Sequence, residues 1–200
     1  MQMDKTLKLA LASLIFNAVF AIYHLVLGIV AGSWWLLTLG SYYLILSIVR
    51  LVILHYRSNE NFITRFTGLM LILLSAPLVG TVVLSIVRDR GQVLHMVLMI
   101  AMAAYTFTKI TLATIKLIKS RHINSGILKA LRNISFAEAF VSIFALQRSM
   151  LVSFEGMNEV EIIIMNASLG TAVCVVVFML GIALIRKAKL ENSTIEKTAE

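Results

Sequence analysis

Six long apolar segments constrain the fold of this chain more than any other feature of its sequence. They cover residues 9–31, 34–55, 66–87, 94–118, 127–154 and 160–185. A helix of about 20 apolar residues crosses a hydrocarbon core about 30 Å thick. Lipid gives the backbone no hydrogen-bond partners, so spans of this length without strand-like alternation should be helical. The sequence therefore predicts an all-α integral membrane protein, with a six-helix transmembrane bundle over residues 1–185.

Composition excludes a water-soluble domain. Hydrophobic residues make up 60% of the chain and charged residues 14%, where soluble domains carry roughly 25% charged residues. The connections are short, so consecutive helices should pack as antiparallel neighbours. Residues 186–200 are polar and too few to bury a core, so we expect this tail to be disordered or fraying. The fifth segment holds several charged residues, and we expect it to face other helices.

The placement of basic residues predicts the orientation in the membrane. The formal net charge of +8 could suggest a nucleic-acid partner, but the basic residues gather at one end of the predicted helices. An excess of Lys and Arg marks cytoplasmic loops, so we expect both termini in the cytoplasm, a cell-membrane location and no nucleic-acid partner. The predicted cytoplasmic residues are Lys5, Lys8, Arg57, Arg65, Lys116, Lys119, Arg121, Lys129, Arg132, Arg186, Lys187, Lys189 and Lys197, against Arg88, Arg90 and Arg148 outside.

Three ionisable residues lie inside predicted spans, where charge is costly and often functional. Arg50 is about 8 Å from the inner end of its helix, so its long side chain can lift the guanidinium to the interface. Lys109 is deeper, and either buried pairing or interface anchoring suits it. Glu138 has too short a stem to escape and must be paired, solvated or protonated. It is either a protonated carboxyl bonding a neighbouring helix or a proton or cation site.

Recognisable catalytic and metal-binding patterns are missing from the sequence. His24, His55, His95 and His122 lie on different segments, without the close pairing that zinc motifs use. We therefore predict no metal site, no cofactor and no enzymatic activity. Polar groups inside spans line a pathway or bond one helix to the next. With Glu138 and Tyr42, three of them form the predicted substrate-binding set, namely Asn17, Ser142 and Asn166.

Two stretches of the chain resemble the membrane domain of the cation diffusion facilitators, which are six-helix zinc and manganese antiporters. The first stretch, from residue 17 to residue 46, contains Asn17, Leu25, Gly28 and the pair Gly32 and Ser33. The second contains Ser125, Ala130, Glu138, Ser142, Asn166, Gly170 and Gly181. Together they cover more than half of the chain. The resemblance implies that the second and fifth helices face one another around a metal site.

The chain departs from that family at the metal ligands. The family places His or Asp four residues before an Asp on each of two helices, and these positions fall on Tyr42, Leu46, Ile134 and Glu138. Aliphatic side chains bind no divalent cation and a phenol is a poor zinc ligand, so the tetrahedral site should be absent. We also expect no counterpart of the family's soluble C-terminal domain. We expect the Tyr42 hydroxyl to donate to the Glu138 carboxyl instead.

Two functions follow from these patterns. The first is a proton-coupled cation transporter related to the cation diffusion facilitators, in which Glu138 is the titrating group. The second is a non-transporting membrane partner or regulator that kept the bundle after its metal site was lost. Both place the chain in a lipid bilayer, as a homodimer or with another membrane protein as partner.

Overall fold

The computed structural model consists of six α-helices over the residues that it describes. These are 2–56, 59–87, 96–120, 125–153 and 158–199, with the side chains at 2–10, 84–87, 119–120 and 191–199 left out. The helices are α1 (Gln2–Ala31), α2 (Trp34–His55), α3 (Glu60–Val87), α4 (Met96–Ser120), α5 (Gly126–Ser153) and α6 (Glu159–Ala199). All six are long and apolar enough to cross a membrane, which confirms the predicted all-helical class with six candidate spans.

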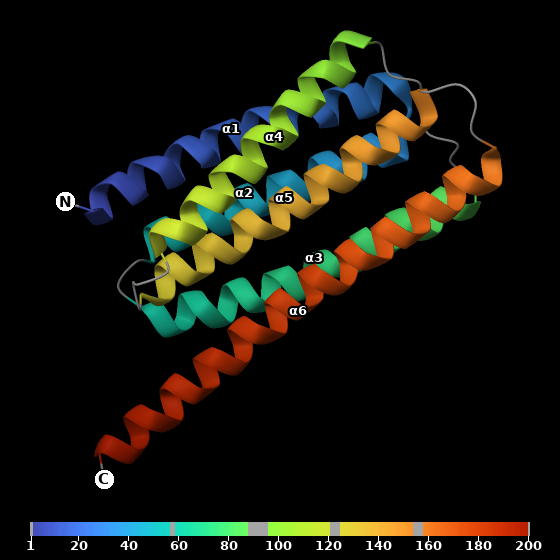
Figure 1. Cartoon of the computed structure of the whole chain (residues 1–200). Helices are drawn as coiled ribbons and strands as arrows, with labels where there is room; N and C mark the ends of the chain where they lie inside the picture. The colour runs from blue at the N-terminus through green and yellow to red at the C-terminus, as the bar shows by residue number, and fades with distance from the viewer. Residues whose placement is uncertain (1, 57–58, 88–95, 121–124, 154–157, 200) are drawn as a thin grey trace.

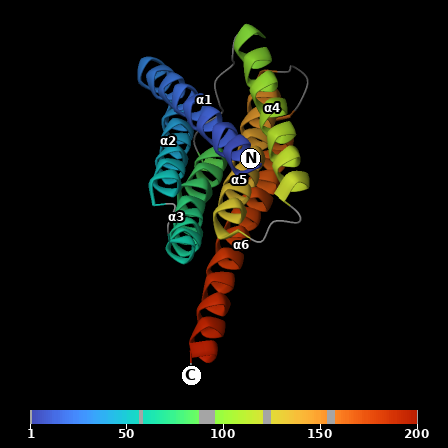
Figure 2. The same ribbon diagram turned by 90° about the vertical axis from the view of Figure 1, so that its left-hand side faces the viewer.

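Consecutive helices run in opposite directions, as the short connections predict (Figure 1). The starts of α1, α3 and α5 therefore lie at one end of the bundle with the last turns of α2 and α4. We call this the N-terminal end. Helix α6 returns to the same end and continues past the other helices (Figures 1 and 2).

Helix α5 lies at the centre of the bundle and contacts α2, α3, α4 and α6. Its inward residues Ile134, Ala137 and Val141 are fully buried, so the prediction that this segment faces other helices is confirmed. Helix α1 packs along α2, and α3 packs along α6. The centre of α5 is consequently shielded by neighbouring helices over most of its length.

Two helices extend beyond the predicted bounds. Helix α3 begins at Glu60 because Asn59 caps it, with Asn59 Oδ1 accepting a hydrogen bond from the Phe62 backbone amide at 3.1 Å. Helix α6 continues to Ala199, over residues where the sequence predicts a disordered or fraying tail. Residues 186–199 contain neither glycine nor proline, and lengthening an existing helix avoids the cost of nucleating a new one.

Large apolar side chains cover the outer surface of the bundle. Val30, Trp34 and Phe107 are among the most exposed, which suits a lipid environment. Trp34 faces outward as expected of an interfacial indole, whereas Trp35 is buried and lies under the Arg148 guanidinium, 4.4 Å from its ring centroid. Two adjacent residues of α2 thus have different surroundings, one at the outer surface and one in the core of the bundle.

The cytoplasmic assignment of the N-terminal end stays a prediction. Several residues behind that prediction or behind the histidine survey lie outside the described residues, or have side chains that do: Lys5, Lys8, Arg57, Arg88, Arg90, His95, Lys119, Arg121, His122 and Lys197.

Candidate functional site

The carboxylate of Glu138 lies fully buried at the middle of α5, where side chains from three other helices reach it. Its Oε2 accepts from Arg50 of α2 at 2.7 Å and from Lys109 of α4 at 2.9 Å. Its Oε1 accepts from the side-chain amide of Asn17 on α1. Of the alternatives that the sequence left open for Glu138, the structure shows a paired carboxylate.

Further polar side chains extend this arrangement, and most of them lie toward the N-terminal end of the bundle. Arg50 also donates to Ser13 and, at 3.2 Å, to Ser135. Lys116 donates to the same Ser135 hydroxyl at 2.8 Å. Lys109 and Tyr105 both donate to Asn17 Oδ1. We call the whole set the Glu138 cluster: Ser13, Asn17, Arg50, Tyr105, Lys109, Lys116, Ser135 and Glu138.

The charges of the Glu138 cluster do not balance. Among the described residues it contains three basic side chains, Arg50, Lys109 and Lys116, and one carboxylate, and their exposures are 0%, 2%, 8% and 0%. Burying an ion costs several kcal/mol unless an opposite charge and hydrogen bonds compensate. Glu138 pairs directly with two of the three basic side chains but carries only one negative charge. The basic side chains outnumber the carboxylate by two, so the cluster repels further positive charge.

The spacing of polar residues along each helix explains how the cluster assembles. Residues three, four or seven apart lie on one helix face. This spacing relates Ser13 to Asn17, Lys109 to Lys116, and Ser135 to Glu138 and Ser142. On α2 it relates Tyr43 to Ser47 and Arg50. Each of the four helices therefore turns one polar stripe toward the others.

A group of aromatic side chains closes the cluster on the side away from the N-terminal end. Phe20 stacks on Tyr105, and Tyr43 meets both rings edge-on. The Ser142 hydroxyl donates to the Glu138 backbone carbonyl at 2.7 Å and accepts from the Tyr43 hydroxyl at 2.7 Å. His24 is buried and bonds the Phe20 carbonyl at 2.9 Å, in line with the rule that buried polar groups are hydrogen-bonded.

The predicted substrate-binding residues do not form one site. Asn17 and Glu138 are in direct contact, and Ser142 joins them through the backbone of α5. Asn166 lies on α6 and is buried, with its Oδ1 making no hydrogen bond to any described residue. Tyr42 also lies apart from the cluster.

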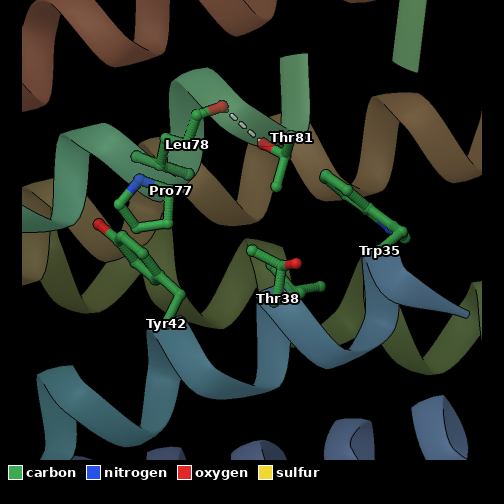
Figure 3. Close-up of a pocket in the computed structure, with 7 residues that line it drawn as sticks. Trp35, Thr38, Tyr42, Pro77, Leu78 and Thr81 are labelled. Carbon is green, nitrogen blue, oxygen red and sulfur yellow. Dashed lines mark hydrogen bonds between the residues drawn. The ribbon is translucent and has the colours of Figure 1, made fainter. Parts of the chain in front are cut away.

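The predicted hydrogen bond between Tyr42 and Glu138 is wrong. The Tyr42 hydroxyl is buried, and no described residue is its hydrogen-bond partner. Tyr42 instead lines a small pocket between α2 and α3, beside Pro77 and Leu78 (Figure 3). Neighbouring residues on a helix point about 100° apart, and Tyr43 is the one directed at α5.

The two intramembrane cations also differ from expectation in part. Arg50 was predicted to reach the interface, but it is fully buried and bonds Glu138. The Glu138 carboxylate within hydrogen-bond distance stabilises the guanidinium better than an extended side chain that reaches water at the interface. For Lys109, the structure shows the buried pairing. Sequence reasoning missed Ser13, Tyr105 and Ser135, and it placed Lys116 only by topology. The spacing of three, four or seven residues between polar side chains on each helix could have identified them.

The Glu138 cluster can hold four helices together, and its hydrogen bonds can rearrange. Its excess of positive charge opposes the binding of a divalent cation. Such an ion requires several oxygen or nitrogen ligands. In the described part of the chain, no group of three or more His, Cys, Asp or Glu residues could hold a metal ion.

Comparison with known proteins does not assign the chain to a family. No protein-family model matches the chain, and no curated protein matches it.

Proposed function

We propose that this chain is a multi-pass membrane protein that moves no cation and acts as a partner or regulator of another membrane protein. Its six apolar helices are compatible with membrane insertion. One observation carries the proposal: the deep carboxylate of Glu138 is already bonded to Arg50 at 2.7 Å and to Lys109 at 2.9 Å. The groups that would have to receive a cation are occupied by the protein's own positive charges.

Electrostatics supports this choice over cation transport. A metal ion approaching Glu138 would have to displace the Lys109 ammonium or the Arg50 guanidinium and would still face Lys116 nearby. Unlike charges attract and like charges repel strongly where water is excluded. The Glu138 cluster therefore favours a fixed internal brace over a site that binds and releases cations.

Descent from the cation diffusion facilitators stays part of the proposal. Leu46 and Ile134, at two of the four ligand positions, are fully buried in the hydrophobic core. A guanidinium and an ammonium beside Glu138 supply the positive charge that a metal would have supplied. This supports a decayed site in a protein without enzymatic activity or cofactor, located in a cell membrane with both termini cytoplasmic.

Reconstitution tests the proposal. Purified protein in proteoliposomes, with a proton-sensitive dye and zinc or manganese gradients, should give the same proton flux as empty vesicles. Pull-down from native membranes should recover a stable complex with another membrane protein. Cation-dependent flux that Glu138→Gln abolishes would overturn the proposal, provided that the exposed-site control Thr111→Val retains it.

A proton-coupled cation transporter is the second candidate, because Glu138 and Lys109 are two titratable groups in direct contact at mid-helix depth. In that mechanism Lys109 gives up its proton and swings away, and a cation takes its place beside the carboxylate. The mechanism predicts flux that Lys109→Met alters as strongly as Glu138→Gln. The proteoliposome assay therefore separates the two candidates.

A further inference from the structure

The Tyr42 hydroxyl is a buried polar group that lies outside the Glu138 cluster. Tyr42 is 2% exposed, and no described residue is a hydrogen-bond partner of its hydroxyl. Its ring meets the Tyr43 ring edge-on, with the ring centroids 5.9 Å apart. The large majority of buried side-chain polar atoms bond the protein or an ordered water molecule. The Tyr42 hydroxyl is therefore expected to have a partner between α2 and α3.

Pro77 leaves a second polar group without its usual partner, this time in α3. The proline lies inside the helix, which continues through it to Val87. Because proline has no amide hydrogen, the carbonyl of Leu73 does not receive the bond that any other residue at position 77 would donate. Lipid offers no replacement, and membrane helices tolerate proline where side chains or ordered waters bond the freed carbonyl. An acceptor in α3 and a donor in α2 thus both require a partner.

Tyr42 and Pro77 line the same small pocket between α2 and α3. Figure 3 shows the Tyr42 ring reaching from α2 toward α3, with its hydroxyl beside the proline ring. The volume of the pocket is about 10 Å³, which is close to the minimum that one water molecule requires. A metal complex, a lipid headgroup or an organic substrate would not fit in this space.

Two threonine hydroxyls supply the other polar groups of the pocket. Thr38 donates to the Trp34 carbonyl at 2.7 Å, and Thr81 donates to the Leu78 carbonyl at 2.6 Å. A hydroxyl that donates one hydrogen bond can still accept others. A water molecule in the pocket would therefore find the two to four polar partners that a buried water needs.

We propose that this pocket binds one water molecule, which accepts a hydrogen bond from the Tyr42 hydroxyl and donates one to the Leu73 carbonyl. Through this water, α2 supplies the donor that Pro77 cannot supply. A water-mediated bond is nearly as favourable in enthalpy as a direct one. The bridge therefore stabilises α3 at the only proline of the chain, whether or not the protein moves cations.

A double-mutant cycle tests the bridge by thermal unfolding of the purified full chain in detergent. In the wild-type background, Tyr42→Phe removes only the hydroxyl and should lower the Tm, because the Leu73 carbonyl loses its donor. In the Pro77→Ala background, the new amide at position 77 bonds that carbonyl. Tyr42→Phe should then leave the Tm unchanged or raise it. Equal Tm shifts in the two backgrounds, of either sign, would overturn the proposal, since the hydroxyl would then act independently of the proline.

The matched control for the loss of a hydroxyl is Tyr56→Phe. Tyr56 is 54% exposed and lies at the C-terminal cap of α2, so this variant should leave the Tm unchanged in both backgrounds. A Tm shift equal to that of Tyr42→Phe would contradict the site, because it would show that removing any tyrosine hydroxyl has the same effect.

A second measurement remains decisive if one of the variants does not fold. It is an experimental structure of the wild-type protein at a resolution that shows ordered water. The bridge predicts one water oxygen within about 3.5 Å of both the Tyr42 hydroxyl oxygen and the Leu73 carbonyl oxygen. A direct bond between these two groups, a lipid chain end in the pocket, or a dry pocket would each overturn the proposal.

Discussion

The guanidinium of Arg50 on α2 donates to the carboxylate of Glu138 on α5 across 2.7 Å, and both side chains are closed off from the surface of the bundle. Lys109 of α4 completes the pairing from the other side at 2.9 Å. Three helices therefore share one ion-pair network, and removing its single carboxylate would leave two buried basic side chains uncompensated. Removing single partners from such a network is expected to be more damaging than its net contribution to stability suggests.

Glu138→Gln should destabilise the bundle strongly. The amide keeps the size of the side chain but removes the negative charge, so Arg50 and Lys109 are left as buried cations. We expect a loss of about 3 kcal/mol or more in the free energy of unfolding. Chemical unfolding in detergent micelles, followed by circular dichroism, measures the change.

The matched control is Glu161→Gln, which makes the same chemical change at an exposed position in the first turn of α6. This variant should shift the free energy of unfolding by no more than about 0.5 kcal/mol. Equal changes in the free energy of unfolding for the two substitutions would mean that the buried charge of Glu138 stabilises the bundle no more than an exposed charge does.

Adding Lys109→Met to Glu138→Gln should recover part of the lost stability. The second substitution removes one of the two cations that the first leaves without a partner. A double-mutant cycle should therefore show a favourable coupling of about 0.5 to 3 kcal/mol between the two sites. In the parallel cycle, Lys189→Met and Glu138→Gln should add within about 0.5 kcal/mol. Additivity at Lys109 as well would argue against a direct ion pair.

Gly68→Ala should separate α3 from α6. A methyl group at Gly68 would lie 2.8 Å from the backbone oxygen of Gly181, and one at Gly181 would lie 2.8 Å from the backbone oxygen of Gly68. Backbone atoms cannot move aside cheaply, so we expect a loss of about 1 to 3 kcal/mol. Small residues at helix contacts allow this close approach in membranes.

Gly80→Ala provides the control for this contact, because no described atom lies within 4 Å of a methyl group placed there. Alanine favours a helix over glycine by about 1 kcal/mol, so this variant should be neutral or stabilised. Comparing thermal unfolding of the two variants separates helix contact from helix propensity. A Gly68→Ala protein as stable as Gly80→Ala would be inconsistent with the observed contact.

Glu60→Ala should weaken the N-terminal end of the bundle. Glu60 begins α3 and accepts from the Ser125 hydroxyl and the Gly126 amide, both at 2.8 Å, so it caps the start of α5 from another helix. Loss of a cap costs about 0.5 to 2 kcal/mol. Hydrogen exchange at the first turn of α5 should rise, while exchange near Glu138 should stay unchanged. Uniform exchange across α5 in both proteins would rule out the capping role.

The bundle was predictable because apolar length alone determines it. Six runs of suitable length and short connections indicate six helices in alternating directions, as found. Burial of α5 followed from its charged residues, which lipid would not accept. Helix ends were less predictable. The cap at Asn59 and the continuation of α6 to Ala199 depend on local hydrogen bonding and on the absence of a helix breaker.

The partners of Glu138 were harder to predict because they depend on how four helices are rotated about their axes. The position of Arg50 near the inner end of its predicted helix favoured an interfacial side chain. The rotation of α2 about its axis instead directs this side chain toward α5. The same rotation directs Tyr43 to Ser142 and Tyr42 to α3. Polar residues at helical spacing on four segments carried the missing information. Pairing these stripes would have placed Arg50, Lys109 and Glu138 together.

The most direct test of an occupied carboxylate is a calorimetric titration of purified wild-type protein with zinc, manganese and cadmium ions. We predict no stoichiometric binding that depends on Glu138, because Arg50 and Lys109 already neutralise it. Tight binding of one metal ion per chain that is lost in Glu138→Gln, and kept in Glu161→Gln, would contradict this account of the Glu138 cluster.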